Sequence, residues 1–410
     1  MATVLRVPTR LSNNRLEIGI PMKSFKSGIA VKSRLFGWLP GTMLLAAVTL
    51  AQAGNIRYTI AEIETLGGTE NFAFGINNRG DVVGMSRTAG DASTYSFLLS
   101  AGAITSLSPL NSGDIRTVGP TGINDDGLVA SGVMQDGVYF PAIYDSRSGQ
   151  ITGLGSLGGV TSFGFSGVAT SINDLGQAAG YSYLDAFNRH AFVYSDGLMT
   201  DIGSFGGYSG ALDINNRGEV AGFASDSVAG YAHAFVYRDG VMTEIDPFGG
   251  PNNESYAEEI NIHGQVVGYG LNADGSAFRG FVYSADGSIV DVGTLKKGRN
   301  SYAFSINDRN RVVGVADYPY RSVCSTPRGN VRCVKFGQHG FLFEGGVMTD
   351  LNALIDPALG WDVQWVFDIN NNGQIAGYGV LDGKFRAFVM TPKARKAIAS
   401  SRGTSEPAND

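Results

Sequence analysis

The chain contains few of the residues from which metal sites and catalytic centres are commonly built. Its 410 residues include two cysteines and four histidines, and only 17% are charged. Two cysteines without a second pair nearby lack zinc-site spacing, and the turns hold too few carboxylates for calcium loops. The sequence shows no glycine-rich loop that opens a helix and no Gly-x-Ser-x-Gly elbow. We therefore expect no metal and no cofactor, and we assign no catalytic residue.

Long apolar runs are equally scarce, and the single candidate lies near the N-terminus. Basic residues between Lys23 and Arg34 precede an apolar run over residues 35–50, and Ala51-Gln52-Ala53 is a small-x-small cleavage motif. This layout predicts that residues 1–53 are an N-terminal extension plus a secretory signal peptide cleaved after Ala53, with translation starting at Met1 or Met22. The alternative is an uncleaved anchor, but the run is short and no stop-transfer charges follow it.

An acidic charge balance excludes further classes of partner. Residues 1–53 carry seven basic and one acidic residue, a charge of +6, so the formal net charge falls from −6 for the whole chain to −12 without them. Duplex nucleic acid requires a positive footprint, and anionic lipid attracts basic surfaces. We expect no nucleic-acid partner, no stable membrane span in the mature chain, and a monomeric protein that is secreted or periplasmic.

What the sequence has in abundance is glycine, with 58 residues, and a repeated motif. The motif reads Ile-Asn-x-x-Gly or close to it, followed by a short apolar run that ends in glycine, as in INNRGDVVG at residues 76–84. The anchor asparagines are Asn77, Asn124, Asn173, Asn215, Asn261, Asn307 and Asn370. Their spacings are 47, 49, 42, 46, 46 and 63 residues, and self-similarity at such a period indicates a repeat architecture.

Each copy predicts four short antiparallel strands. In residues 77–80 asparagine opens a type I turn and glycine supplies a positive φ; the sixth copy has Asn310 instead of glycine, and asparagine also tolerates this conformation. One strand precedes the turn and another follows it. The third is an aromatic run such as residues 190–194, HAFVY, and the fourth resembles residues 198–203, LMTDIG. Four such strands in seven copies predict a seven-bladed β-propeller.

The sequence also predicts how the ring closes. The last copy ends with its third strand near Met390 and lacks a fourth, whereas residues 58–63 at the start of the chain form an unassigned strand. We predict that this N-terminal strand completes the last blade, so that the propeller domain spans residues 54–390. Residues 391–410 are polar, lack aromatic side chains and are expected to be a disordered tail.

The order of the HAFVY, GxMTDLG, LGG and INxxGxVVG segments resembles the HAF-repeat family of bacterial extracellular repeat proteins. The resemblance covers roughly residues 58–390 and is strongest in the third to fifth copies, whereas the second copy has YFPAIY as its aromatic run. It implies an exported repeat protein. It brings no assigned reaction and no catalytic residues.

One repeat position collects most of the histidines. His190, His233 and His339 share this position on the third strand, and other copies place tyrosine, phenylalanine or arginine there. A position that accepts all four side chains is most simply a packing position. A metal site would require these residues on neighbouring inner strands, whereas the third strand lies away from the axis.

A second position, two residues before the anchor asparagine, holds Asp213, Glu259 and Asp368 in three copies. If the first strand lines a central channel, these carboxylates form a partial acidic ring that could attract a cation or a polar ligand, or perform acid–base chemistry. The simpler interpretation is three solvated or blade-bridging carboxylates.

The sixth copy is stretched to 63 residues, and the extra length lies at residues 317–338 between its second and third strands. This segment contains Cys324 and Cys333, which we expect to form a disulfide because the protein is expected to be exported. It also gathers aromatic and basic side chains on an acidic protein. The candidate binding residues are Tyr318, Tyr320, Arg321, Arg328 and Arg332.

Two functions from different classes remain open. The first is an exported, non-enzymatic scaffold that binds a glycan or a surface protein through the face carrying the variable loops, since loops on a rigid scaffold concentrate binding residues. The alternative is an exported hydrolase or lyase that uses the carboxylates of the channel. Propellers host both, so the fold alone does not choose between them.

Overall fold

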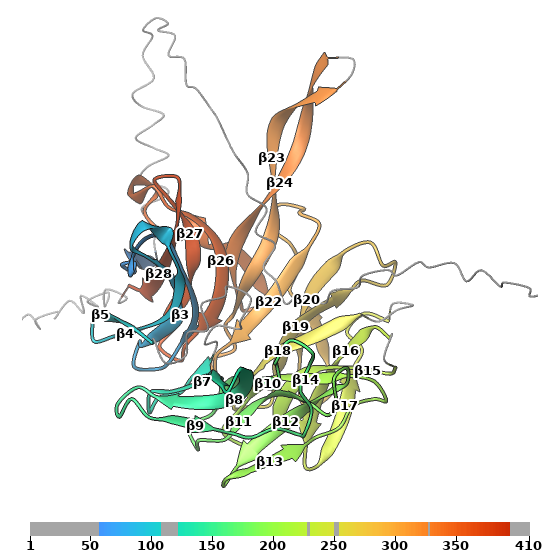
Figure 1. The fold of residues 1–410 in the computed structure, drawn as a ribbon. Helices are drawn as coiled ribbons and strands as arrows, with labels where there is room; N and C mark the ends of the chain where they lie inside the picture. The colour runs from blue at the N-terminus through green and yellow to red at the C-terminus, as the bar shows by residue number, and fades with distance from the viewer. Residues whose placement is uncertain (1–56, 108–121, 228–229, 250–253, 327–328, 394–410) are drawn as a thin grey trace, which may run out of the picture. The chain divides into compact units, whose positions relative to one another are not determined.

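The computed structural model describes residues 57–107, 122–227, 230–249, 254–326 and 329–393, all of which belong to one compact unit, residues 48–410. The predicted signal peptide, residues 394–410 of the predicted tail and Arg328 lie outside the described residues, whereas Thr391 and Pro392 belong to the last strand. The strands assemble into seven four-stranded antiparallel sheets, which confirms the predicted seven-bladed propeller (Figure 1).

Blades 1 to 6 follow the chain, and each uses four consecutive strands. Blade 1 comprises β2 (Gly67–Ile76), β3 (Val82–Thr88), β4 (Thr94–Ser100) and β5 (Ala103–Ser106). Blade 2 comprises β6 (Gly122–Ile123), β7 (Leu128–Gln135), β8 (Val138–Asp145) and β9 (Ile151–Gly153). Blade 3 comprises β10 (Gly167–Ile172), β11 (Ala178–Tyr183), β12 (Arg189–Ser195) and β13 (Leu198–Asp201).

The later blades repeat the pattern. Blade 4 comprises β14 (Ser209–Ile214), β15 (Val220–Ser225), β16 (Ala232–Arg238) and β17 (Val241–Ile245). Blade 5 comprises β18 (Ser255–Ile260), β19 (Val266–Leu271), β20 (Phe278–Tyr283) and β21 (Ile289–Asp291). Blade 6 comprises β22 (Ser301–Ile306), β23 (Val312–Thr326), β24 (Gly329–Glu344) and β25 (Val347–Asp350). Short 3-10 turns are present at η1 (Ala89–Asp91), η3 (Leu351–Ala353) and η4 (Pro357–Leu359).

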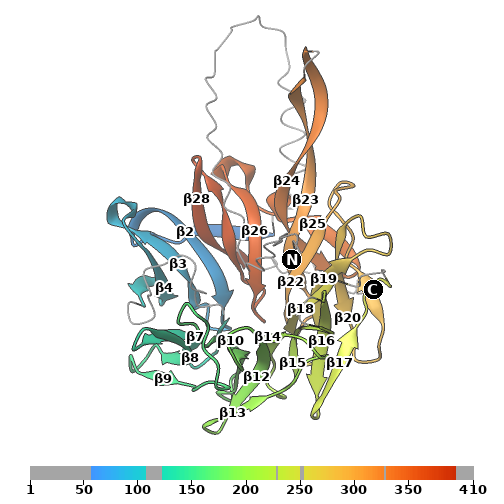
Figure 2. The ribbon, with the colours of Figure 1, turned by 45° about the vertical axis from the view of Figure 1, so that its right-hand side comes forward.

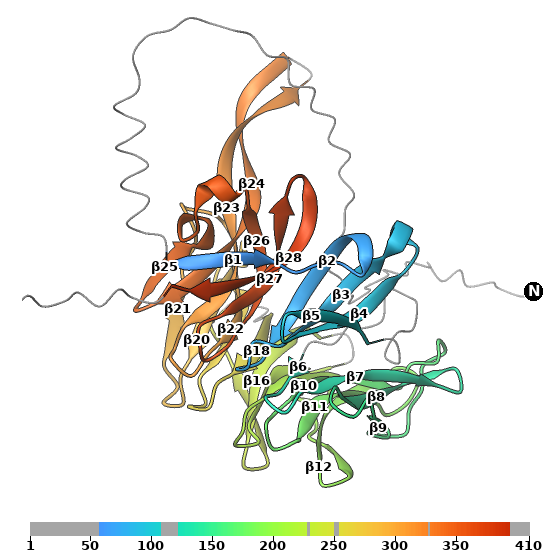
Figure 3. The ribbon, with the colours of Figure 1, turned by 90° about the vertical axis from the view of Figure 1, so that its left-hand side faces the viewer.

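Blade 7 joins the two ends of the domain, as the sequence predicts. Its strands β26 (Asp362–Ile369), β27 (Ile375–Leu381) and β28 (Lys384–Pro392) come from the end of the chain, and β1 (Tyr58–Glu62) pairs with β28 (Figure 3). The register runs from Tyr58 opposite Pro392 to Glu62 opposite Phe388. β28 therefore continues two residues beyond Met390. The first strands of blades 1 and 7, β2 and β26, lie side by side (Figure 2).

The glycines of the repeat motif have two separate structural causes. The turn glycine has a positive φ in six copies, and Asn310 of the sixth copy has φ 58°, which confirms the predicted turn. The glycine that follows the apolar run, such as Gly84 or Gly268, has no room for a Cβ, because the carbonyl of the first strand lies against it. This close approach accompanies a β-bulge in the first strand, where residues such as Glu258 fall between two registers.

The core consists of layers between neighbouring blades. The phenylalanine of the HAFVY-like run is fully buried in six blades, at Phe97, Phe192, Phe235, Phe281, Phe341 and Phe388. One such layer joins Ile63 after β1 to Ala73 and Phe97 of blade 1 and Ala387 of blade 7. The repeated aromatic residue is therefore a packing residue, and the N-terminal strand is held by apolar contacts as well as by backbone hydrogen bonds.

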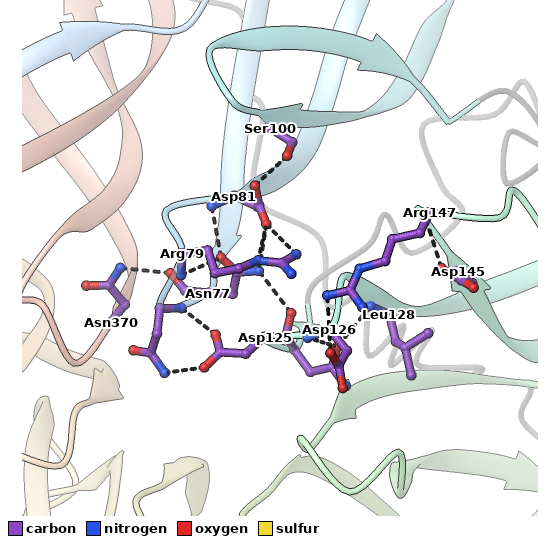
Figure 4. Close-up of polar contacts among 12 residues, drawn as sticks. Asn77, Arg79, Asp81, Ser100, Asp125, Asp126, Leu128, Asp145, Arg147 and Asn370 are labelled. Carbon is purple, nitrogen blue, oxygen red and sulfur yellow. Dashed lines mark hydrogen bonds and ion pairs between the residues drawn. The ribbon is translucent and has the colours of Figure 1, made fainter.

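A closed ring of asparagine side chains joins all seven blades at the turn end. Each anchor asparagine is 4–6% exposed and donates from Nδ2 to the carbonyl oxygen of the anchor asparagine in the next blade. The last link runs from Asn370 Nδ2 to the Asn77 carbonyl at 2.8 Å and closes the circle (Figure 4). Each Oδ1 accepts the backbone N–H groups two and four residues on, as Asn77 does from Arg79 and Asp81.

Candidate functional site

The three carboxylates predicted for the channel lie in one layer around the axis of the propeller, because the first strands of successive blades contact one another around the ring. Asp213 Oδ2 accepts the backbone N–H of Ile260 in the next blade at 2.9 Å, and Ser171 Oγ donates to Asp213 Oδ1 at 2.6 Å. Asp368 Oδ2 accepts the N–H of Ile76 at 2.7 Å. The carboxylates therefore bridge neighbouring blades.

In this layer, the charge of one carboxylate also raises the pKa of another. Burial and the charges of Asp368 and Asp213 raise the pKa of Glu259 well above its ordinary value. Burial raises the pKa of Asp213 as well, and it raises the pKa of Asp368 to about 6 despite hydrogen bonds from Ile76 and Ser305. Each group nevertheless has a backbone donor from the next blade or a serine partner, which is the pattern of a structural carboxylate.

The three carboxylates predicted from the sequence therefore take part in hydrogen bonds between blades. Among the residues that the structure describes, no group of three or more His, Cys, Asp or Glu side chains is arranged to hold a metal ion.

At the shared histidine position each ring contacts a carboxylate of the same blade. Nδ1 of His190 lies 2.9 Å from Asp201, that of His233 lies 2.9 Å from Glu244, and that of His339 lies 2.8 Å from Asp350. In blades 5 and 7 arginine takes the same place, with Arg279 paired to Asp291 and Arg386 to Glu62. The third strand is thus linked to the fourth by a contact between a histidine or arginine side chain and a carboxylate, which adds to the expected packing.

Aromatic side chains form the inner surface of blades 5, 6 and 7 on the side of the variable loops. The rings of Tyr269 and Tyr302 lie 5.0 Å apart across a blade boundary, and Phe304 lies 5.6 Å from Phe367 across the next. Phe367 in turn contacts Phe74 of blade 1 at 5.4 Å. Most of these rings are partly exposed. On the first strand β22, Tyr302 and Phe304 alternate with buried residues, and no feature of a single repeat indicates that rings of different blades meet.

The stretched copy folds as a long two-stranded ribbon, which differs from the predicted loop. β23 and β24 stay in register from Val312 opposite Phe343 to Thr326 opposite Gly329. The neighbouring strands stop early, since β22 reaches only Ala316 and β25 only Phe341. Residues 318–326 and 329–337, called the arm below, therefore run on without a third strand (Figure 1).

The two faces of the arm differ in chemistry. The disulfide between Cys324 and Cys333, predicted from the sequence, lies on the face that also carries Tyr320 and Lys335. Residues opposite each other in the register share a face. The other face therefore carries Phe336, Val334 and Val323, which are 51%, 59% and 62% exposed. Arg321 pairs with Val334 and Arg332 with Val323, so both guanidinium groups flank this apolar row.

The predicted binding residues divide between the base and the length of the arm. Tyr318 lies at the base, where its ring stacks on His339 with ring centres 3.9 Å apart, and Lys296 Nζ lies over the Tyr318 ring at 4.5 Å from its centre. Tyr320, Arg321 and Arg332 are exposed along the arm. Sequence reasoning missed the valines and Phe336, although alternation with the arginines could have indicated them once a strand was assumed.

Comparisons with known proteins find similarity among solved structures alone. No family model matches the chain, and no curated protein matches it. Among solved structures, it is similar to the β-propeller domain of the Trilobed protease from Pyrococcus furiosus, with 9% identity over 82% of this chain and 99% of that one and a TM-score of 0.49. It is also similar to oligogalacturonate lyase from Vibrio parahaemolyticus, with 10% identity over 82% and 97% and a TM-score of 0.45.

TolB from Acinetobacter baumannii is a third similar structure, with 11% identity over 86% of this chain and 68% of that one and a TM-score of 0.39. At such low identity these likenesses assign no activity. A search of the described residues for a helix long and apolar enough to span a membrane found none.

Proposed function

We propose that the protein is an exported, non-enzymatic β-propeller scaffold whose arm binds an acidic protein partner. The observation that carries this proposal is the exposed apolar row of Val323, Val334 and Phe336 on a ribbon with no third strand. The arm leaves the blade through the connection between second and third strands, and the blade-to-blade connections leave from the same end. It therefore extends from the face that carries the variable loops.

The charge of the arm favours an acidic partner. Residues 318–338 contain four basic residues and no acidic residue, whereas the whole chain has a net charge of −6. Complementary charge raises the association rate and selects against wrong partners. The same argument disfavours the pairing of two arms from two copies, because both would carry the same charge.

A protein fits the arm better than a glycan does. Both strands of the arm have one unpaired edge, and such edges accept an extended peptide through main-chain hydrogen bonds. Aliphatic side chains such as Val323 and Val334 contribute contact area to a protein surface. A glycan site would instead use several aromatic platforms, whereas this face exposes the single ring of Phe336 among the described residues of the arm, and Tyr320, 46% exposed, lies on the opposite face.

Export is part of the same proposal. The signal-like segment at residues 1–53, the resemblance to HAF repeats and the disulfide between Cys324 and Cys333 agree on an oxidising compartment outside the cytoplasm. Secretion is tested by fractionating cells that express the full chain and determining the N-terminal residue of the exported form. Gly54 is the expected first residue, and a chain that keeps residues 1–53 and stays in the cytoplasm would contradict export.

Binding is tested with the full chain and fluorescent peptides of alternating Glu and Val, with Lys–Val peptides and an acidic polysaccharide as comparisons. We expect the acidic peptide to bind and the basic peptide to fail. Val334→Ser should weaken binding at least about tenfold, which corresponds to about 1.4 kcal/mol. Val241→Ser is the matched control, because Val241 is 61% exposed on blade 4 and lies outside the arm.

The outcomes separate the alternatives. Equal binding of acidic and basic peptides, or equal loss in both valine variants, would contradict recognition by the arm. Binding of the polysaccharide alone, with loss in Arg321→Ala, would replace the protein partner by an acidic glycan.

A further inference from the structure

The inner surfaces of blades 3 and 5 differ at equivalent positions of the repeat. In blade 3, the guanidinium of Arg189 lies 4.2 Å from the ring centre of Tyr181 and 5.8 Å from that of Tyr208. Tyr181 stands eight residues after its anchor asparagine, and Tyr269 stands eight residues after the anchor of blade 5. The chain thus places its own cation over the aromatic surface of blade 3.

Blade 5 has an aromatic surface without such a cation. The position of Arg189 is taken by Phe278, since Arg189 pairs with Tyr183 and Phe278 pairs with the equivalent Leu271. The ring of Phe278 lies 5.7 Å from that of Tyr269. The rings of Tyr256 and Tyr302 lie 5.2 and 5.0 Å from Tyr269, and Phe304 lies 6.3 Å from it, so four further rings surround Tyr269.

Carboxylates stand among these rings. Glu258 occupies the bulge of β18, where blade 3 has Thr170, and it accepts a hydrogen bond from Tyr269. Glu254 accepts one from the hydroxyl of Tyr256 at 3.4 Å. Burial raises the pKa of Glu258 to about 7, which reflects the cost of a charge in this apolar setting.

Among the described residues, neither Glu254 nor Glu258 takes part in an ion pair. Glu258 also lacks the backbone donor from the next blade that the carboxylates of the axis have. Tyr256, Tyr269, Tyr302, Phe304 and Glu258 are each partly exposed, so a small solute can reach them.

We propose that Glu258 and the surrounding rings of Tyr256, Tyr269, Tyr302 and Phe304 bind an organic ammonium cation. Aromatic faces attract such a cation through their quadrupoles, and the attraction strengthens where water is excluded. The Glu258 carboxylate supplies a negative charge, and among the described residues no basic side chain forms an ion pair with it. The ligand thus takes in blade 5 the place that Arg189 takes in blade 3. This site is separate from the arm and does not depend on its proposed partner.

The test uses the full chain, choline as the probe, and the neutral isostere of choline in which a tert-butyl group replaces the trimethylammonium. Binding is followed by calorimetry and by tyrosine fluorescence. We expect choline to bind more than about tenfold tighter than the isostere. Glu258→Gln should weaken choline binding about tenfold and leave the isostere unchanged. Glu64→Gln, which removes an exposed carboxylate elsewhere, is the matched control and should change neither.

A second variant distinguishes loss of the binding site from loss of the fold. Phe304→Leu keeps an apolar side chain but removes one ring, and we expect it to weaken choline several-fold with an unchanged circular dichroism spectrum. Equal affinity of choline and its isostere, absence of choline binding to the natural chain, or an equal effect of both glutamate variants would each overturn the proposal.

Discussion

The ring of anchor asparagines makes a quantitative prediction about stability, and Asn173 offers the cleanest case. Its Nδ2 donates to the Asn215 carbonyl at 2.9 Å and to Gln177 Oε1 at 2.8 Å, and its Oδ1 accepts the N–H groups of Leu175 and Gln177 at 3.0 Å. Asn173→Ala removes all four bonds at a site that is 4% exposed. At about 1 kcal/mol for each bond, the free energy of unfolding should fall by about 4 kcal/mol.

The expected change in melting temperature follows from the size of the domain. With an unfolding entropy of about 2.1 cal/mol/K for each residue and the strands spanning Tyr58 to Pro392, a loss of about 4 kcal/mol lowers the melting temperature by about 6 °C. Differential scanning calorimetry measures this value directly. Asn173→Asp keeps the acceptor oxygen but loses both donations from Nδ2, so it should fall between the natural chain and the alanine variant.

The control is another asparagine in a turn. Asn188 makes one side-chain donation, to Asp185 at 2.7 Å, in an exposed loop of the same blade. Asn188→Ala should therefore cost less than about 1 kcal/mol. If Asn173→Ala melts at the same temperature as Asn188→Ala, the four buried hydrogen bonds of Asn173 would be no better than bonds to water, and the reasoning would fail.

Three further predictions concern other parts of the fold. The pKa of Glu258 is about 7 in the folded protein and 4.5 in the unfolded chain. Between pH 4.5 and pH 7 the native state therefore binds more protons than the unfolded chain, and its stability falls as the pH rises through this range. Glu258→Gln should gain about 3 kcal/mol over the natural chain between pH 4.5 and pH 8 in urea titrations, and a pH-independent difference would contradict the burial of this group. Reducing the disulfide between Cys324 and Cys333 should speed hydrogen exchange in the arm, because a two-stranded ribbon is marginally stable alone. The main melting transition should stay in place. A shift of that transition would show that the arm contributes to the stability of the blades. Ile63→Ala should lower the free energy of unfolding by about 2–5 kcal/mol, because Ile63 is 3% exposed between blades 7 and 1. Leu198→Ala, at a site that is 66% exposed, should lower it by less than about 0.5 kcal/mol. Similar losses in denaturant unfolding would mean that the N-terminal strand contributes little.

The carboxylates of the axis show how the same residue type serves two purposes. Asp213 and Asp368 accept hydrogen bonds from backbone N–H groups of the next blade and so link neighbouring blades. Glu258, one position earlier in the repeat, points among aromatic rings and has a tyrosine hydroxyl as its partner. The bulge in the first strand creates this difference, because it turns two successive side chains toward the inside of the propeller.

Local chemistry made much of the fold predictable from the sequence. Turn residues such as Gly80 and Asn310 adopt positive φ for reasons that lie within four residues, and strands of Val, Ile and aromatic residues alternate over six. Counting four strands in each of seven copies then predicts the blades, and the missing strand of the last copy predicts its completion by residues 58–62. The pairing of Cys324 with Cys333 followed from there being no other cysteine.

Tertiary structure decided the contacts that connect distant copies. The Nδ2 of Asn370 meets the carbonyl of Asn77 only because the ring closes, although 293 residues separate them along the chain. The rings around Glu258 come from two blades, and their meeting depends on the angle between those blades. The sequence by itself determined what each repeat is, because turns and strands depend on near neighbours. Only the packed ring decided which side chains of different repeats touch, because register and bulges set their directions.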